Sequence, residues 1–394
     1  MLAVDTTTTS GTRANTGIQR VTRELTKGLS NLCTVQPLIH DPGTGRWKEP
    51  DRKALARIFH QEDLKPGRRR GIRGKPWTSL QQLLEPGRPT RSPIPSKLTG
   101  FIEPEIFNDR VHHGLGGYLE RVNGPSLALY YDSTPLKLPE LSPRKNTGQF
   151  PVYLRQLLQF DAVAAISESS KDELDSYWNW LGIRTRPVVE AIPLAVDLAH
   201  FRTLPPQDHA GSRKVLCVGS IEGRKNQVAL LQAAEKLWEN GHAFDLVLLG
   251  LASRSTSGQA LELLNELQGK GRSVKWMGPS SENDLRTQYA TCHFTVYPSL
   301  AEGFGLPVLE SLKHGKPCIC SSQGAIGEIS TQGGCHTVEQ PTPNQLAGAM
   351  EQLLTDQNHY EELQQEARGR DFRTWSDYAK DIFEFHKSLS KAKA

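Results

Sequence analysis

Apolar strand-like segments that alternate with helical patterns constrain the fold of this sequence more than any other feature. In the second half of the chain these segments lie at 214–219, 244–250, 273–276, 293–299 and 317–322. Helical patterns separate them, at 228–238, 258–270, 281–291 and 306–314. Uninterrupted apolar strands that alternate with helices are typical of parallel sheets covered by helices on both faces. This half of the chain is therefore predicted to be an α/β domain.

The first half of the chain shows a second alternation of the same kind. A short apolar strand opens the sequence, and a helix is predicted from about Gly17 because apolar residues recur at helical spacing: Ile18, Val21, Leu25 and Leu29. Further strand-like segments lie at 126–131, 161–166 and 188–194, separated by helical patterns at 151–160 and 168–180. A polar, proline-containing stretch at 201–213 is typical of a linker between domains.

These patterns predict two Rossmann-like domains. The chain of 394 residues is too long for one ordinary domain, and we place the domains at 1–205 and 206–373. A last helical pattern at 374–390 lies beyond the second alternation. We expect the segment 374–394 to pack back on the first domain.

Composition limits the class of protein. No run approaches the roughly 18 to 20 apolar residues that a membrane span needs, and the sequence opens on a strand-like LAVD instead of an apolar leader. The six cysteines form no C-x-x-C pair, and several lie inside apolar strands. We therefore expect a cytoplasmic protein rather than a membrane-spanning or secreted one.

A basic, proline- and glycine-rich insertion interrupts the first domain at 41–100. It carries 14 basic and 6 acidic residues, net +8, whereas the whole chain carries +4. We favour a solvated surface insertion. The alternative is contact with an acidic acceptor or, peripherally, with anionic lipid on the inner face of the membrane, through the cations of 65–75: Lys65, Arg68, Arg69, Arg70, Arg73 and Lys75. Nucleic acid is not expected, because no aromatic residue is interleaved there to stack on bases.

Two loops at strand ends have the composition of anion sites. In doubly wound sheets the ligand crevice lies beyond the carboxyl ends of the strands. Gly17 begins the first helix, where a phosphate could approach bare backbone amides, although a glycine at a helix start is more often a simple turn residue. Arg224 and Lys225 follow the strand 214–219, and this pair suits a diphosphate. The alternative is an exposed charge pair beside a helix capped by Asn226.

A third loop carries two carboxylates eight positions apart. Glu302 and Glu310 flank a glycine-rich turn, with Pro307 placed to start a helix and Glu310 expected in its first turn. A phosphate could dock on the amides between them, a ribose diol could bind Glu310, and a sugar could meet Glu302. Glu310 could instead only compensate the helix dipole. That alternative explains neither Glu302 nor its coincidence with the Arg224–Lys225 loop.

At these residues the sequence resembles a known family. The segments VGSIEGRKNQ, YPSLAEGFGLPVLESLKHGKPCI and TGIQRVTREL are similar to glycosyltransferase family 4, as are ISESSKDEL and AIPLAVDLAHF. Its members are retaining glycosyltransferases of GT-B fold that use nucleotide-sugar donors, and they carry a Glu-x7-Glu motif, met here by Glu302 and Glu310. The resemblance implies an acceptor-binding first domain and a donor-binding second domain that face a central cleft.

The resemblance also implies roles for single residues. Glu310 would bind the ribose of the donor, and Arg224 with Lys225 would neutralise its diphosphate. Gly17 would let the diphosphate approach the first domain, and Met277 would line the base pocket. The transferred sugar would be held by a separate group, formed by Glu302 and the loop Gly303, Phe304, Gly305 and Leu306.

The sequence departs from the family pattern at two positions. Ser220 stands where many members have an arginine, so the positive charge must come from elsewhere, with Arg224 as the first candidate. Tyr131 and Asp132 stand where members often have a histidine at the end of a central strand. Tyr131 could hydrogen-bond a sugar hydroxyl of the acceptor. Asp132 could orient or deprotonate the acceptor hydroxyl, or could simply cap the following turn.

The expected reaction is retaining transfer of a hexose from GDP-mannose or a UDP-hexose to a hydroxyl of a glycan or lipid-linked acceptor in cell-surface polysaccharide synthesis. The family resemblance implies same-face attack, with the leaving phosphate taking the acceptor's proton. No metal or other cofactor is expected, because cations and helix dipoles would neutralise the diphosphate. The alternatives are a nucleotide-sugar epimerase and a non-catalytic protein that binds sugar nucleotides or polysaccharide. A nicotinamide oxidoreductase ranks lower, since no strand is followed by G-x-G-x-x-G.

Overall fold

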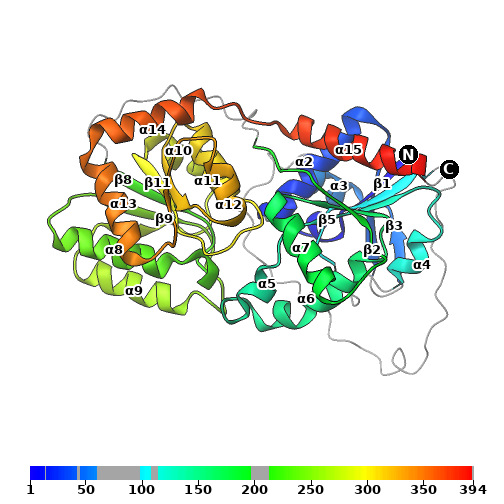
Figure 1. Cartoon of the computed structure of the whole chain (residues 1–394), viewed down its shortest axis with the longest axis horizontal. Coiled ribbons are helices and arrows are strands. Elements are labelled where there is room, and N and C mark those ends of the chain that lie inside the picture. Colours follow the sequence, from blue (N-terminus) through cyan, green and yellow to red (C-terminus); the bar gives the residue numbers. More distant parts are fainter. Residues whose placement is uncertain (14, 42–44, 60–97, 108–113, 197–212, 393–394) are drawn as a thin grey trace.

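The computed structural model describes residues 1–13, 15–41, 45–59, 98–107, 114–196 and 213–392 of the chain (Figure 1). The cations at 65–75, for which membrane contact was the alternative to a solvated insertion, lie outside the described residues. So does nearly all of the predicted linker at 201–213. The described chain forms two α/β domains that lie side by side, as the colours of Figure 1 show.

The first domain is built on a seven-stranded sheet in the order β3-β2-β1-β4-β5-β6-β7. Its strands are β1 (Leu2–Asp5), β2 (Val35–Asp41), β3 (Arg46–Lys48), β4 (Gly100–Glu103), β5 (Ser126–Tyr130), β6 (Ala162–Ala165) and β7 (Val188–Ala191). Only the edge strand β3 runs antiparallel to its neighbour. Its helices are α1 (Thr7–Ser10), α2 (Gly17–Leu32), α3 (Arg52–Phe59), α4 (Leu115–Leu119), α5 (Thr134–Lys137), α6 (Arg144–Leu157) and α7 (Glu168–Trp180).

The second domain has a six-stranded, fully parallel sheet in the order β10-β9-β8-β11-β12-β13. Its strands are β8 (Lys214–Val218), β9 (Asp245–Leu249), β10 (Val274–Trp276), β11 (Phe294–Tyr297), β12 (Cys318–Ser321) and β13 (Cys335–Val338). Its helices are α8 (Gln227–Glu239), α9 (Gly258–Gly269), α10 (Glu282–Thr291), α11 (Leu306–Lys313), α12 (Gly324–Ser330), α13 (Pro343–Thr355) and α14 (Gln357–Gly369).

The strand order of each sheet reverses at one point, and these points locate the crevice. The reversal lies between β1 and β4 in the first domain and between β8 and β11 in the second. Ligands of open α/β sheets bind at such switch points, beyond the carboxyl ends of the strands. The loops after β8 and β11 are those that carry the Arg224–Lys225 pair and Glu302.

The predicted α/β architecture is confirmed, and the structure adds elements that the patterns did not predict. Part of the segment 41–100 is regular, because it contains β3, α3 and the start of β4. Strands β3 and β4 are only three and four residues long, and β2 contains Pro37, so none forms a clear apolar run. Strand β13 and helices α12 to α14 were also missed.

The chain returns to the first domain at its end. Helix α15 (Trp375–Ala392) packs against α2, where Tyr378, Ala379 and Ile382 are buried (Figure 1). A Cβ on Gly28 would stand 2.4 Å from Cβ of Ala379, so glycine permits this close helix contact. Within the described ranges, no helix has the length and apolar character needed to cross a membrane.

Candidate active site

The loop after β8 turns two cations toward the second switch point. A short 3-10 turn, Gly223–Lys225, leads into α8, and Asn226 takes a left-handed conformation with φ of 55°. Capping of α8 by Asn226 belonged to the alternative interpretation of this loop, and the side chain makes no capping hydrogen bond. Instead its amide nitrogen donates to the carbonyl of Pro341 at 2.8 Å. The left-handed turn explains this difference, because it directs the side chain away from the helix amides.

Arg224 and Lys225 converge on the Glu302 carboxylate. Glu302 Oε1 lies 2.7 Å from Nη1 of Arg224 and 2.6 Å from Nζ of Lys225. Ser299 also donates its hydroxyl to this oxygen, and Nζ of Lys225 lies 2.5 Å from the hydroxyl of Tyr297. Two segments that are distant in sequence, the loop after β8 and the end of β11 with its following loop, therefore form one polar cluster, which we call the Glu302 cluster.

The cations determine the charge state of Glu302. Burial raises the pKa of this carboxyl, but attraction to Lys225 and Arg224 outweighs burial and lowers the pKa to about 2. Burial lowers the pKa of Lys225, and the Glu302 carboxylate opposes that shift. Glu302 is therefore ionised at neutral pH and acts as an acceptor of hydrogen bonds, not as an acid.

Ser220 and Glu222 complete the second-domain side of the cluster. Ser220 occupies a position where an arginine was expected from the family pattern, and its hydroxyl donates to Oε1 of Glu222 at 2.9 Å. The same oxygen lies 2.9 Å from Nη2 of Arg224. Arg224 is thus held between two carboxylates, which raise its pKa against the effect of burial. Ser220 orients a partner of Arg224 and supplies no charge.

Glu310 is buried separately from Glu302, with only 4% of its surface exposed. It was expected in the first turn of α11, but the helix begins at Leu306, and Glu310 lies in the second turn. Its Oε2 accepts a hydrogen bond of 2.9 Å from the hydroxyl of Tyr289. Its Oε1 pairs with Arg20 of α2, which belongs to the first domain.

The turn between the two glutamates lies against the first domain. A Cβ on Gly303 would stand 2.0 Å from the carbonyl oxygen of Tyr131, so only glycine permits this approach. The carbonyl of Gly303 accepts hydrogen bonds of 2.8 Å from Ser167 and 3.2 Å from Ser170 at the start of α7. Gly305 has φ of 120°, a conformation that L side chains rarely adopt. The close backbone approach at Gly303 and the positive φ at Gly305 thus explain why both positions are glycine.

The side chains next to these glycines pack in the core. Phe304 is 8% exposed and Leu306 is partly buried, and both contact an apolar cluster that includes residues of both domains. Gly17 begins α2, is exposed, and has open space where a Cβ would stand. Met277 follows β10 and packs partly buried on a small apolar cluster under β9. Its amide donates to Leu248.

Tyr131 does not face the cleft, contrary to the prediction of an acceptor contact. Its hydroxyl donates to the carbonyl of Pro104 at 2.6 Å, and burial raises the pKa of the phenol well above its usual value. The residue directly follows β5, a central strand covered on both faces, so its ring belongs to the core.

Asp132 lies beside the Glu302 cluster. Its Oδ1 accepts a hydrogen bond of 2.8 Å from the amide of Thr134. This is the turn-capping contact that the sequence analysis gave as the alternative role of Asp132. Its Cβ is 3.1 Å from the position that a Cβ on Gly303 would take, and its charge contributes to the raised pKa of Arg224. The structure therefore brings Asp132, Arg224, Lys225 and Glu302 together.

A second group of buried carboxylates lies at the first switch point. Asp5 ends β1, Glu103 ends β4, and Glu105 follows two residues later; each is at most 1% exposed. Glu105 accepts hydrogen bonds from the amides of Thr8 at 2.5 Å and Thr9 at 2.7 Å. Burial and the neighbouring Asp5 raise the pKa of Glu105 to about 7 and that of Glu103 well above its usual value.

Sequence reasoning missed several members of the site. Arg20 lies in the segment assigned to the first domain's glycine loop, but the prediction rested on Gly17 alone. Tyr297 and Ser299 end the strand-like segment 293–299, and nothing in their spacing indicated that they contact a cation and a carboxylate. The buried acids Glu103 and Glu105 lie beside a short strand that the patterns did not predict.

Known proteins resemble this chain in sequence and in fold. Residues 205–370 match the family model "Glycosyl transferases group 1". The O-antigen chain mannosyltransferase B of Escherichia coli is 26% identical over 238 residues, covering 58% of this chain and 61% of that protein. A D-inositol 3-phosphate glycosyltransferase of Acidothermus cellulolyticus is 30% identical over 183 residues, 42% of this chain and 40% of that protein. The chain thus spans less than two thirds of the length of these curated relatives.

Solved structures match nearly the whole chain. HepE of Anabaena has a TM-score of 0.68 at 16% identity, covering 98% of this chain and 99% of its own. Sucrose-phosphate synthase of Thermosynechococcus elongatus has a TM-score of 0.68 at 17% identity, with 99% of each chain covered. At this identity the likeness concerns the fold alone. The chain therefore has the GT-B fold, and its residues 205–370 match the glycosyl transferases of group 1.

Proposed function

We propose that this protein is a retaining glycosyltransferase that moves a hexose from a nucleoside-diphosphate sugar to a hydroxyl of a glycan or lipid-linked acceptor. One observation carries the proposal. Arg224, Lys225 and Glu302 converge at the switch point of the second sheet, beside Asp132 of the first domain. The cation pair can stabilise the negative charge of a departing diphosphate, and the two carboxylates can accept hydrogen bonds from sugar hydroxyls.

Relatives support the same class of reaction. Several curated proteins that match this chain are named mannosyltransferases, including the O-antigen chain mannosyltransferase B described above and the serotype-specific mannosyltransferase WbdA, both of Escherichia coli. HepE was solved in complex with UDP and glucose. We therefore propose GDP-mannose or a UDP-hexose as the donor, and a cell-surface polysaccharide or its lipid-linked precursor as the acceptor.

Arg224 and Lys225 would stabilise the departing diphosphate. Their charges are balanced in this structure by Glu302 and Glu222. Arriving phosphate oxygens would compete for the same donors, since a guanidinium offers several N–H groups and an ammonium offers three. Burial strengthens each such contact because little water screens it. Negative charge that develops on the leaving phosphate would thus be met by groups already in position.

Glu302 would hold the transferred sugar. With a pKa of about 2 its carboxylate stays ionised, so it can accept hydrogen bonds from sugar hydroxyls while it keeps both cations in place. Asp132 would orient the acceptor hydroxyl, and the leaving phosphate would take its proton on the same face of the sugar. Such same-face attack conserves the anomeric configuration.

Glu310 would bind the ribose of the donor. In this structure Arg20 and Tyr289 already occupy its two oxygens. A ribose diol would have to displace Arg20, which comes from α2 of the first domain. Arg20 would then transfer its hydrogen bonds to the donor.

The test is to incubate the protein with GDP-mannose, UDP-glucose, UDP-galactose and UDP-N-acetylglucosamine, each with a panel of oligosaccharide acceptors. We expect release of nucleoside diphosphate that depends on acceptor, and a product whose anomeric configuration, measured by NMR, equals that of the donor. An inverted product would contradict the retaining mechanism. Sugar interconversion without an acceptor would indicate an epimerase, and binding without release of diphosphate would indicate a non-catalytic protein.

A further inference from the structure

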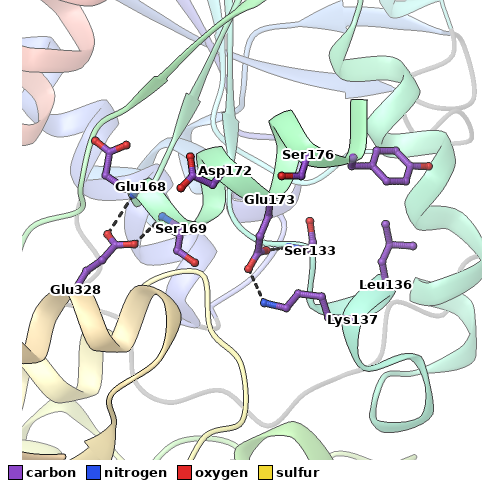
Figure 2. Close-up of a pocket in the computed structure, with 10 residues that line it drawn as sticks. Ser133, Leu136, Lys137, Glu168, Ser169, Asp172, Glu173, Ser176 and Glu328 are labelled. Carbon is purple, nitrogen blue, oxygen red and sulfur yellow. Dashed lines mark hydrogen bonds and ion pairs between the residues drawn. The ribbon is translucent and has the colours of Figure 1, made fainter. Parts of the chain in front are cut away.

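A pocket of about 750 Å³ lies beside the candidate active site and is distinct from the Glu302 cluster. Figure 2 shows that its walls come from α5 and α7 of the first domain and from Glu328 on α12 of the second. Glu328 reaches it by accepting hydrogen bonds from the amides of Glu168 at 3.1 Å and Ser169 at 2.6 Å. The pocket therefore depends on the present arrangement of the two domains.

Helix α7 presents two rows of polar side chains to this pocket. The first row is Glu168, Asp172 and Ser176, and the second row is Ser169, Glu173 and Tyr177. Residues four apart lie above one another on a helix, so each row forms a ladder along the same face. Asp172 and Ser176 are exposed, and Figure 2 shows them along the helix.

The charge of the pocket selects the kind of ligand. Four carboxylates and one ammonium group, that of Lys137, line it. Lys137 is already paired with Glu173 at 2.7 Å. Phosphate groups would be repelled from such a lining, so the pocket does not suit a second nucleotide or the diphosphate of a lipid carrier.

Hydroxyl-rich neutral ligands fit this lining. Carboxylates accept hydrogen bonds from hydroxyl groups, and serine hydroxyls can donate or accept. Tyr177 adds an aromatic ring with an apolar face, on which the C–H face of a sugar ring can pack. Trp180 lies 6.2 Å from Tyr177 between ring centroids and is 79% exposed, so the aromatic surface continues along α7 beyond the pocket.

The pocket is connected to the proposed reaction centre through the backbone. Ser133, in its wall, directly follows Asp132, and its amide donates to Oε2 of Glu173 at 3.1 Å. Ser170 of α7 donates to the carbonyl of Gly303, next to Glu302. A glycan whose terminal hydroxyl meets Asp132 would therefore leave the cleft beside this pocket.

We propose that the pocket, with the Tyr177–Trp180 surface, binds the sugar units of a neutral oligosaccharide acceptor that precede the reacting unit. This inference rests on the proposed function and names the substrate class of the acceptor. It explains why an exposed tryptophan follows a row of carboxylates and hydroxyls on one helix. It also implies that acceptor binding favours the arrangement of domains in which Glu328 closes the wall.

The experiment measures binding of the full chain to an array of immobilised oligosaccharides with one to five units: neutral, anionic and amino-sugar types. We expect retention of neutral oligosaccharides of three or more units. The variants Asp172→Ala, Asp172→Asn and Tyr177→Ala should each weaken this binding about tenfold, equivalent to one or two lost contacts. Glu362→Ala, which removes an exposed carboxylate from α14, is the matched control and should bind as the wild type does.

Three outcomes would overturn the proposal: no retention of neutral glycans, preference for anionic or amino-sugar types, or unchanged binding by all three variants. Thermal unfolding of each variant identifies any that fails to fold. If Asp172→Ala or Tyr177→Ala does not fold, binding by Asp172→Asn, which keeps the size of the side chain, is the deciding measurement. Release of nucleoside diphosphate by the wild type is measured separately. If no nucleoside diphosphate is released, the proposed function is contradicted. Whether the pocket binds neutral oligosaccharides is decided by the array alone.

Discussion

Buried carboxylates lie at the switch points of both sheets, and their surroundings differ. In the second domain Glu302 is held by Arg224 and Lys225, and its pKa falls to about 2. In the first domain Glu103 and Glu105 lie beside another acid, Asp5, and their pKa values rise, that of Glu105 to about 7. Burial acts in the same direction at both places, so the neighbouring charges decide the sign.

This difference in neighbouring charge suggests which domain binds which substrate. Both sheets offer a crevice at the same topological position, and the second crevice holds the Arg224–Lys225 pair that suits a diphosphate. The first crevice holds carboxylates against the amides of α1 and would repel a phosphate. The proposed donor therefore belongs to the second domain, and the proposed acceptor site along α7 continues the acidic character of the first.

The largest expected effect comes from removing a cation of the Glu302 cluster. Lys225→Ala should lower donor turnover by about 100- to 1000-fold, since one lost donor to a developing anion costs this much in related sites. Steady-state release of nucleoside diphosphate measures it. Lys236→Ala, on the exposed face of α8, is the control. Turnover of Lys225→Ala at the wild-type rate, together with Glu310→Ala at the same rate, would refute the assigned roles.

A second prediction concerns stability in acid. The folded pKa of Glu302 lies below its unfolded value of roughly 4.3, so its contribution to the free energy of unfolding is present above that pH and lost as pH falls toward 2. Its size is about 3 kcal/mol. Glu302→Gln should reduce the dependence of the free energy of unfolding on pH, measured in denaturant titrations between pH 2 and 6. An unchanged slope would mean that the cations do not stabilise this carboxylate.

The acids of the first domain should show the opposite sign. The folded pKa of Glu105 is raised, so the folded state holds a proton that the unfolded state has lost, and stability falls as pH rises from about 4.3 to about 7. Glu103→Gln removes an acid whose ionisation is opposed by burial and by Asp5, and should raise the free energy of unfolding at pH 8 by about 1 to 2 kcal/mol. Chemical denaturation at pH 5 and pH 8 measures this. A destabilised variant at pH 8 would contradict the account of repulsion.

The smallest expected effect concerns the contact between the domains. Arg20→Ala frees Glu310 for a ribose, so binding of guanosine or uridine without phosphates should tighten about fivefold, equivalent to about 1 kcal/mol. Calorimetry measures it. Lys27→Ala, which breaks a partly exposed ion pair with Glu24 on the same helix, should leave this affinity unchanged. Weaker binding by Arg20→Ala would show that Arg20 supports the ribose site instead of competing for it.

The sequence predicted the second domain better than the first, for physical reasons. The strands of the second sheet are apolar runs between helices, and β8 and β11 were placed within two residues at each end. In the first domain β2 contains a proline and β4 has four residues, so neither forms a run that periodicity detects. Helix α3 lies next to a segment rich in proline, glycine and charge, and was therefore assigned to the irregular insertion.

The candidate site shows the same limit. Spacing and residue type brought Arg224, Lys225 and Glu302 to one crevice, because strand ends meet at one edge of a parallel sheet. Tyr131 was misplaced because the sequence does not show which face of a buried strand end is open. Arg20 could not be paired with Glu310 from the sequence, since the contact depends on how two separately folded domains approach each other.

The central claim is that the Glu302 cluster is the diphosphate site of a donor. The direct measurement is the dissociation constant of GDP or UDP compared with that of the corresponding nucleoside, for the wild type and for Lys225→Ala. We expect the wild type to bind one diphosphate at least about 100-fold more tightly than its nucleoside, roughly 2.7 kcal/mol, and Lys225→Ala to lose most of this preference. Equal affinity for diphosphate and nucleoside in the wild type would contradict it.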